Sequence, residues 1–112
     1  MRCLGNEQQT ILDSLYFGLG TPTGSVSPEE WQNFLAEVVT PRFPSGLTVA
    51  AASGQWKNAN QQIEHEDSRV VQIVHPQTPA DEERIRAIIA EYQRRFHQEA
   101  VMRVRGAACV SF

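Results

Sequence analysis

The chain has 112 residues, enough for one domain of the usual size of about 100–150 residues. Its 10 Lys and Arg residues against 13 Asp and Glu residues give a formal net charge of −3, so no positive field draws it to a nucleic acid. The hydrophobic content of 41% is typical of a globular protein, and no apolar run approaches the roughly 20 residues that span a membrane. We therefore expect one domain over residues 1–112, in which residues 1–10 form a poorly ordered or disulfide-tethered N-terminal segment.

The first part of the chain predicts a strand and then a helix. Residues Ile11–Leu19 are apolar and lead into a loop at Gly20–Ser25, which is rich in Gly and Pro. Ser27 can cap a helix, and a glutamate three positions later completes a capping box. We expect this helix to end near Thr40, before Pro41. Its apolar residues recur at helical spacing and would form one buried stripe: Trp31, Phe34, Leu35, Val38 and Val39.

The middle of the chain predicts a hairpin. Residues 41–46 contain two prolines and a glycine, which favour a stiff turn. Leu47–Ala52 then predicts a strand that continues to Trp56. Residues 58–60 supply the turn, because Asn tolerates a positive φ, and Gln62–His75 predicts a long partner strand.

The last part of the chain predicts a second helix and a fourth long strand. Thr78 can cap the helix and Pro79 fits its first turn, while Glu82 and Arg86 are spaced for an ion pair. Residues Val101–Phe112 alternate as a strand does. The order β-α-β-β-α-β is that of a ferredoxin-like α+β sandwich. We therefore expect a four-stranded antiparallel sheet in the order 4-1-3-2, with both helices on one face.

The other face of such a sheet is left open for contact. The alternation of the first strand places Leu15 and Phe17 toward the helices and Tyr16 toward the open face, where Val70 and Val74 also lie. A face this apolar favours self-association, through the face itself or through a long strand edge. We therefore expect a homo-oligomer, such as a dimer.

The last strand presents two alternating pairs of residues. Met102 and Val104 share one side, and Arg103 and Arg105 share the other. Alternation alone does not decide which pair lines the open face.

Five residues are candidates for a pocket or an interface: Tyr16, Arg42, Trp56, His75 and Arg103. His75 ends a central strand and could serve as a general base, although a histidine that caps a loop fits equally. Arg42 could bind an anion with its planar guanidinium, or pair with Glu37 or a helix end. Tyr16 and Trp56 are either packing residues or a platform for a ligand.

No familiar catalytic or cofactor motif stands out. The three histidines lack metal-binding spacing, so we expect no metal site. The pair Gly18 and Gly20 lacks the third glycine of a dinucleotide-binding loop, and we expect no cofactor. The two cysteines, Cys3 and Cys109, are either independent thiols or a disulfide that closes almost the whole chain and indicates an oxidising compartment.

Several motifs resemble a bacterial family of uncharacterised domains. They are Leu15–Gly18 (LYFG), Val38–Pro44 (VVTPRFP), Gly46–Val49 (GLTV), Gly54–Trp56 (GQW) and Cys109–Phe112 (CVSF). Many proteins of this family resemble exported proteins or lipoproteins with a cysteine before the first strand. Cys3 is similar to that cysteine, so the resemblance makes the Cys3–Cys109 disulfide as strong an expectation as two free thiols. The chain begins without a signal sequence, which indicates a cytoplasmic protein as written and an exported one if a signal was trimmed.

Two hypotheses for function follow. The first is a small non-enzymatic binding or interaction module that associates with itself, or with a protein or small molecule, through its sheet. The second is a cofactor-independent enzyme of the dimeric α/β-barrel type, a monooxygenase or an isomerase, whose pocket would include Tyr16, Trp56, His75 and Arg103. RNA binding shares the fold, but the chain lacks the aromatic and basic motifs of that class.

Overall fold

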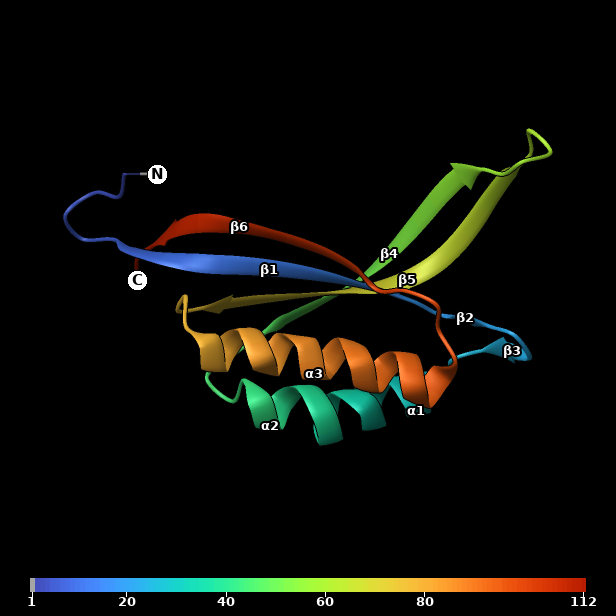
Figure 1. Ribbon diagram of the computed structural model, residues 1–112, viewed down its shortest axis with the longest axis horizontal. Helices are drawn as coiled ribbons and strands as arrows, with labels where there is room; N and C mark the ends of the chain where they lie inside the picture. The colour runs from blue at the N-terminus through green and yellow to red at the C-terminus, as the bar shows by residue number, and fades with distance from the viewer. Residues whose placement is uncertain (1) are drawn as a thin grey trace.

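The computed structural model describes residues 2–112, and Figure 1 shows its elements in chain order. Residues 2–112 form six strands, three α-helical segments and one π-helical turn, η1, which connects α1 to α2. In order they are β1 (Gln8–Gly18), β2 (Gly20–Thr21), β3 (Gly24–Ser25), α1 (Pro28–Phe34), η1 (Leu35–Val39), α2 (Thr40–Arg42), β4 (Thr48–Lys57), β5 (Ile63–His75), α3 (Pro79–Phe96) and β6 (Met102–Val110).

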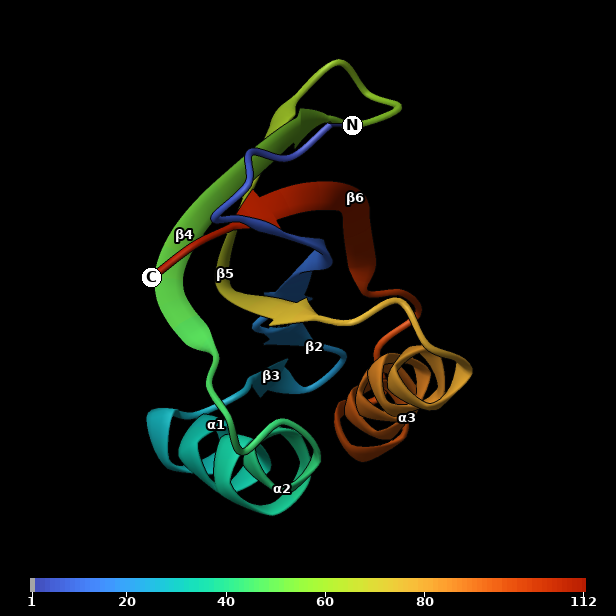
Figure 2. The same cartoon turned by 90° about the vertical axis from the view of Figure 1, so that its left-hand side faces the viewer.

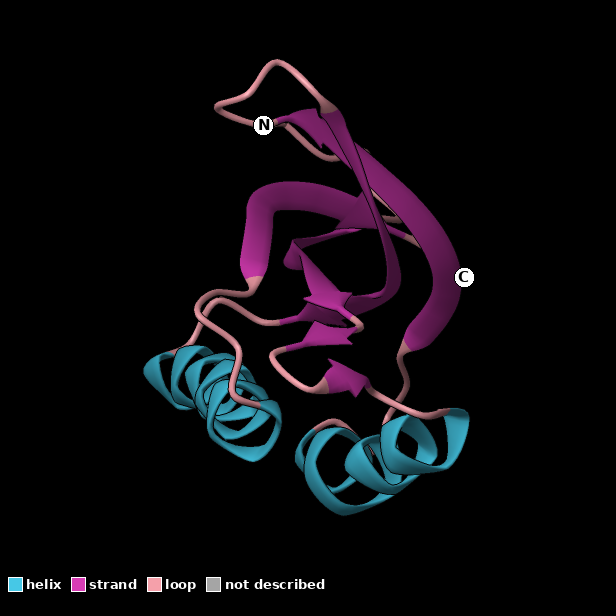
Figure 3. Ribbon diagram, turned by 90° about the vertical axis from the view of Figure 1, so that its right-hand side faces the viewer, coloured by secondary structure: helices cyan, strands magenta, loops and turns pink. Residues whose placement is uncertain are grey.

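The four long strands form one antiparallel sheet in the order β4-β5-β1-β6, which confirms the predicted order of strands. The helices lie together on one side of this sheet (Figure 3). The central strand β1 pairs with β5 from Ile11↔His75 to Gly18↔Ser68. On its other side β1 pairs with β6 over nearly its whole length. The α+β fold expected from the sequence is therefore confirmed.

The core lies between the sheet and the helices and is built around aromatic rings. Phe17 of β1 lies with its ring centroid 4.7 Å from that of Tyr92, and Phe34 lies 5.0 Å from Tyr92. Trp31 packs at the edge of the same cluster. The Tyr92 hydroxyl donates a hydrogen bond to the Gly18 carbonyl, so burying this ring leaves no polar atom unpaired. Four residues of the stripe predicted for the first helix belong to this core, and the rest comes mainly from β1, β5 and α3.

The sequence predicted that the first helix ends before Pro41, and this prediction is wrong, because the helix continues through Pro41. Its hydrogen bonding widens at η1, where the Thr40 N–H bonds to the Leu35 carbonyl five residues back, and the chain continues helically to Arg42. Pro41 then occupies the first turn of α2, where a missing N–H costs little. The predicted stiff turn over residues 41–46 is therefore shortened, because Pro41 and Arg42 belong to the helix.

Two connections also differ from the prediction. The loop at residues 20–25 contains the short hairpin β2–β3. In the β4–β5 turn, the residue with a positive φ is Gln61, not an asparagine. Asn58 instead stabilises the turn with its side-chain oxygen, which accepts hydrogen bonds from the N–H groups of Asn60 and Gln62.

The starts of the helices agree closely with the sequence. Ser27 and Glu30 form the predicted capping box at the start of α1. The Thr78 hydroxyl accepts a hydrogen bond from the Asp81 N–H at the start of α3. The pair Glu82–Arg86 is present, with 2.8 Å between the nitrogen and the oxygen.

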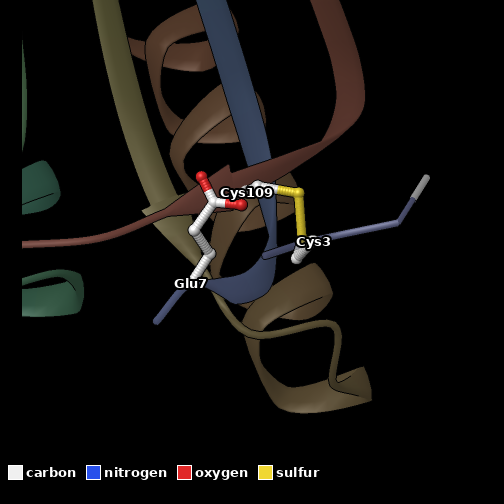
Figure 4. A group of neighbouring side chains, drawn as sticks. All are labelled: Cys3, Glu7 and Cys109. Carbon is white, nitrogen blue, oxygen red and sulfur yellow. A yellow bond between two sulfur atoms is a disulfide. The ribbon is translucent and has the colours of Figure 1, made fainter. Parts of the chain in front are cut away.

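A disulfide joins Cys3 to Cys109 and fixes the N-terminal segment against β6 (Figure 4). The two residues are separated by 106 positions, and their Cα atoms lie 5.4 Å apart. A turn between Leu4 and Glu7 brings the Glu7 side chain beside the sulfurs, within 4.8 Å. Of the two possibilities for these cysteines, free thiols or a disulfide, the structure contains the disulfide. A disulfide is consistent with an exported protein.

The β4–β5 hairpin extends well beyond the rest of the sheet (Figure 2). The β1–β5 register ends at Gly18↔Ser68, and the Leu19 N–H still donates a hydrogen bond of 3.0 Å to the Asp67 carbonyl. Residues 63–66 of β5 pair only with β4. We call this outer part, residues 53–67, the arm. The radius of gyration is 15.7 Å, whereas a compact domain of this length has about 13 Å. The arm therefore gives the molecule its elongated shape.

Candidate functional site

A cluster of four charged residues lies where the helix side of the sheet meets the start of α3. Asp13 of β1 is fully buried, and His75 at the end of β5 is almost so. The Asp13 carboxylate accepts a hydrogen bond of 2.6 Å from His75 Nε2 and bonds of 2.6 and 3.1 Å from Arg103 Nε and Nη2. Arg103 also donates two bonds, of 2.9 and 2.7 Å, to the Glu82 carboxylate. These residues are joined in one network, here called the ion cluster.

Both ring nitrogens of His75 are engaged within the protein. Its Nε2 faces the Asp13 carboxylate at 2.6 Å and its Nδ1 faces the Pro76 carbonyl oxygen at 2.7 Å. The imidazole ring is therefore held between these two groups.

The network also shifts the titration of its more accessible members. The Arg103 hydrogen bonds lower the pKa of Glu82 to about 2, from an ordinary value of 4.5. The bonds to Glu82 and Asp13 raise the pKa of Arg103 above its usual range. Arg103 and Glu82 are therefore both charged at neutral pH.

A cleft of about 520 Å³ opens beside the ion cluster, and its walls come from β5, β6 and the start of α3. Arg105 lies on this wall, directly opposite Asp13 in the β1–β6 register. Within residues 2–112, Arg105 makes no ion pair or side-chain hydrogen bond. The lining residues are His75, Gln77, Thr78, Pro79, Glu82, Arg103 and Arg105.

The open face of the sheet is the second candidate surface. A row of apolar side chains crosses all four strands on this face, because Tyr16 stands opposite Val70 and Met102, and Val70 stands opposite Ala50. Met102 and Val104 are more than half exposed. The pair left undecided by alternation is thereby settled: Met102 and Val104 line the open face, and the two arginines lie on the helix side.

A cavity of about 420 Å³ lies on the open face at the base of the arm. Tyr16, Trp56 and Met102 line it together with the half-buried Glu66. The Glu66 carboxylate crosses the backbone of Gly18 so closely that a Cβ there would lie 2.8 Å from one of its oxygens. A side chain at position 18 would therefore require the flexible end of Glu66 to move away.

The five candidate residues thus fall into three places. Tyr16 and Trp56 share the cavity on the open face, and His75 and Arg103 meet in the ion cluster. Arg42 belongs to neither pair, although it and His75 line a third cavity, of about 380 Å³. Arg42 donates a hydrogen bond of 2.9 Å to the Val38 carbonyl at the end of its own helical segment.

Asp13 is not among the candidate residues predicted from the sequence, and Glu82 was expected only to pair with Arg86 on its helix. A signal for Asp13 was available, since it is the one charged residue in the apolar alternation of β1, on the face that carries Leu15 and Phe17. A carboxylate in such a stripe is buried only with a cationic partner. The partners, however, lie 62 and 90 positions away.

One group of potential metal ligands lies in the part of the chain that the structure describes. Cys3, Glu7 and Cys109 have side chains close enough to share an ion, but the two sulfurs are bonded to each other. Across residues 2–112, no helix has both the length and the apolar character needed to cross a bilayer.

The fold is similar to that of a phage SAM lyase solved in complex with S-methyl-5′-thioadenosine. The TM-score is 0.65 at 15% sequence identity, and the match covers 100% of this chain and 95% of that chain. The apo state of a phage SAM lyase matches with a TM-score of 0.61 at 15% identity, over 100% and 95% of the two chains. At this identity the likeness establishes a shared fold.

Comparison by sequence leads to a family rather than to an activity. No curated protein matches the chain. A family described as a protein of unknown function, DUF3574, matches residues 12–112, which contain all the motifs on which the resemblance to uncharacterised domains rested. The chain therefore belongs to the DUF3574 family.

Proposed function

We propose that this protein is a small binding module that associates with a second copy of itself through the open face of its sheet and the arm. The observation that carries the proposal is the apolar row across the open face. Val74, Met102 and Val104 on this face are 47%, 58% and 52% exposed. Burying apolar side chains of this size is favourable by about 25 cal/mol per Å².

The arm supports the same proposal. A two-stranded ribbon by itself is at best marginally stable in water, and the arm has no third strand over residues 63–66. Trp56 and Ile63 near its tip are about half exposed. A second copy packed against the open-face side of the arm would cover Trp56, which shares that side with Tyr16, and would supply the missing support.

The free edge of β4 is also suited to a second copy. Nine of its ten residues are exposed, and it contains no proline and a single charged residue, Lys57. Natural edge strands usually contain prolines or several charged residues, which prevent pairing with another strand, and β4 has few of these. Antiparallel pairing of β4 with the same strand of another copy would be symmetric, which is the usual form of a homodimer contact.

The state of His75 supports binding rather than catalysis at the ion cluster. Both ring nitrogens face oxygen atoms within the protein at 2.6 and 2.7 Å, so neither directs a lone pair at the cleft. A general base needs such a lone pair within reach of its substrate. This geometry favours the non-enzymatic hypothesis over the monooxygenase or isomerase.

The mass of the protein in solution tests the proposal. We expect light scattering to give a multiple of 12.6 kDa for the native chain, and a lower mass for Met102→Glu, which places a charge in the apolar row. Leu4→Glu is the matched control, because Leu4 is equally apolar and exposed but lies off the sheet. A monomeric native chain at high concentration, or equal masses for both variants, would overturn the proposal.

A second candidate function is favoured by the cavity at the base of the arm. Tyr16 and Trp56 offer aromatic surfaces, and the Glu66 carboxylate, with no ion pair in the described part of the chain, faces the same space. An aromatic surface next to a carboxylate suits a purine nucleoside or a cation. The phage lyase of similar fold was solved with S-methyl-5′-thioadenosine, so this chain would be a small-molecule enzyme or binder of that class.

Titration with S-methyl-5′-thioadenosine and with S-adenosylmethionine tests this second candidate. Trp31 is buried and Trp56 is exposed, so stacking on Trp56 should quench the exposed part of the fluorescence. The signal should disappear in Trp56→Phe, and heat of binding should fall in Glu66→Gln. If neither compound binds the native chain, the second candidate is wrong.

A further inference from the structure

The cleft beside the ion cluster has an unbalanced charge. Inside the cluster, the Asp13 carboxylate is used by Arg103 and His75, and Glu82 is held by Arg103 and Arg86. The cluster therefore has no free carboxylate for Arg105, although Arg105 stands directly opposite Asp13 on the neighbouring strand. The guanidinium of Arg105 is left facing the cleft without a partner in residues 2–112.

The surroundings of Arg105 favour a negatively charged group. The cleft lies at the start of α3, an 18-residue helix whose N-terminal end has a positive partial charge. The Gln77 side chain on the connecting loop can donate from its amide. The one carboxylate in the lining, Glu82, already accepts two hydrogen bonds from Arg103 and one from Arg86, so its charge is largely compensated.

The buried cluster gives the cleft a fixed wall. Arg103 is held at its Nε, Nη1 and Nη2 atoms, and His75 is held at both ring nitrogens. A buried ion network of this kind is weak as a source of stability, since its desolvation offsets its attraction. Its effect here is to hold β1, β5, β6 and α3 in one arrangement around the cleft.

We propose that this cleft binds a small molecule through an oxyanion, a carboxylate or a phosphate, and that Arg105 is the residue that pairs with it. The volume of about 520 Å³ lies within the range of small-molecule sites, about 300–1,000 Å³. The planar guanidinium of Arg105 can donate two parallel hydrogen bonds to either kind of group. This site is separate from the open face, so it does not depend on self-association.

Calorimetric titration of the full chain at low salt tests the proposal with two probes, citrate for carboxylates and inorganic phosphate for phosphates. We expect at least one probe to bind, and Arg105→Gln to weaken it by about tenfold, the loss of one charge-assisted contact. Arg105→Lys, which keeps the charge, should retain part of the affinity. Lys57→Gln is the matched control, because it also removes an exposed cation without an ion pair in the described residues, but on the arm.

The outcomes separate cleanly because Arg105 is exposed and its replacement leaves the core intact. Preference for citrate or for phosphate identifies the ligand class. The proposal is overturned if the native chain binds neither probe, if Arg105→Gln binds as tightly as the native chain, or if Lys57→Gln weakens binding equally.

Discussion

At the scale of single residues, the ion cluster is the most unusual feature of this chain. Asp13 occupies a fully buried position that the alternation of β1 would otherwise give to an apolar side chain. It is tolerated there because Arg103 and His75 satisfy its oxygens. Replacing one residue of the ion cluster should therefore lower the free energy of unfolding by more than the intact cluster contributes to it, because a buried charge is left without its partner.

We expect Asp13→Asn to lower the free energy of unfolding by about 3–5 kcal/mol, the usual cost of breaking a buried ion pair. Urea denaturation measures this change. Glu37→Gln is the control: it breaks an exposed ion pair with Arg95, and such a change costs about 1 kcal/mol or less. Equal stability of the Asp13 variant and the native chain would show that the network is not formed.

The pH dependence of stability should depend on Glu82. Its pKa is about 2 in the folded protein and returns to an ordinary value near 4.5 on unfolding, because Arg103 no longer holds it. Because the pKa of Glu82 is lower in the folded protein, ionised Glu82 stabilises the fold. This stabilisation should be complete at pH values above 4.5, the pKa in the unfolded chain, and should be lost as the pH falls to about 2, the pKa in the folded protein. Melting temperatures between these two values should fall less steeply for Glu82→Gln, and an unchanged slope would contradict the assignment.

At the scale of elements, features that depend on neighbouring residues were predicted correctly from the sequence, and contacts between residues far apart in the chain were not. The caps at Ser27 and Thr78 are set by neighbouring residues, and both appear as expected. The end of the first helix was missed, since the widened turn η1 that accommodates Pro41 leaves no clear mark on the sequence. The ion cluster was missed because it joins residues far apart in the chain.

The disulfide ties one edge of the sheet to the start of the chain. It closes a loop of 106 positions, so it restricts the unfolded chain strongly. Reduction, or the double change Cys3→Ser and Cys109→Ser, should lower the free energy of unfolding by about 2–5 kcal/mol. Denaturation with and without a reductant measures this, and the double variant should not respond to the reductant. If reduction leaves the native chain as stable as before, the bond has no role in stability.

At the scale of the whole molecule, the chain combines a conventional layer of helices on a sheet with an arm that the fold alone does not explain. The order of strands follows from the order of predicted elements, but the arm does not. Its existence depends on β1 ending its pairing at Gly18 while β5 continues to Ile63. Sequence patterns show how long each strand is, and they do not show how far two strands overlap.

Self-association is the claim that connects the open face, the arm and the free edge of β4. Amide hydrogen exchange over residues 53–67, followed at several protein concentrations, tests it most directly, because an isolated ribbon opens easily and a covered one does not. We expect exchange in the arm to slow as the concentration rises, while exchange in α3 stays the same. Exchange in the arm that is equally fast at every concentration would contradict it.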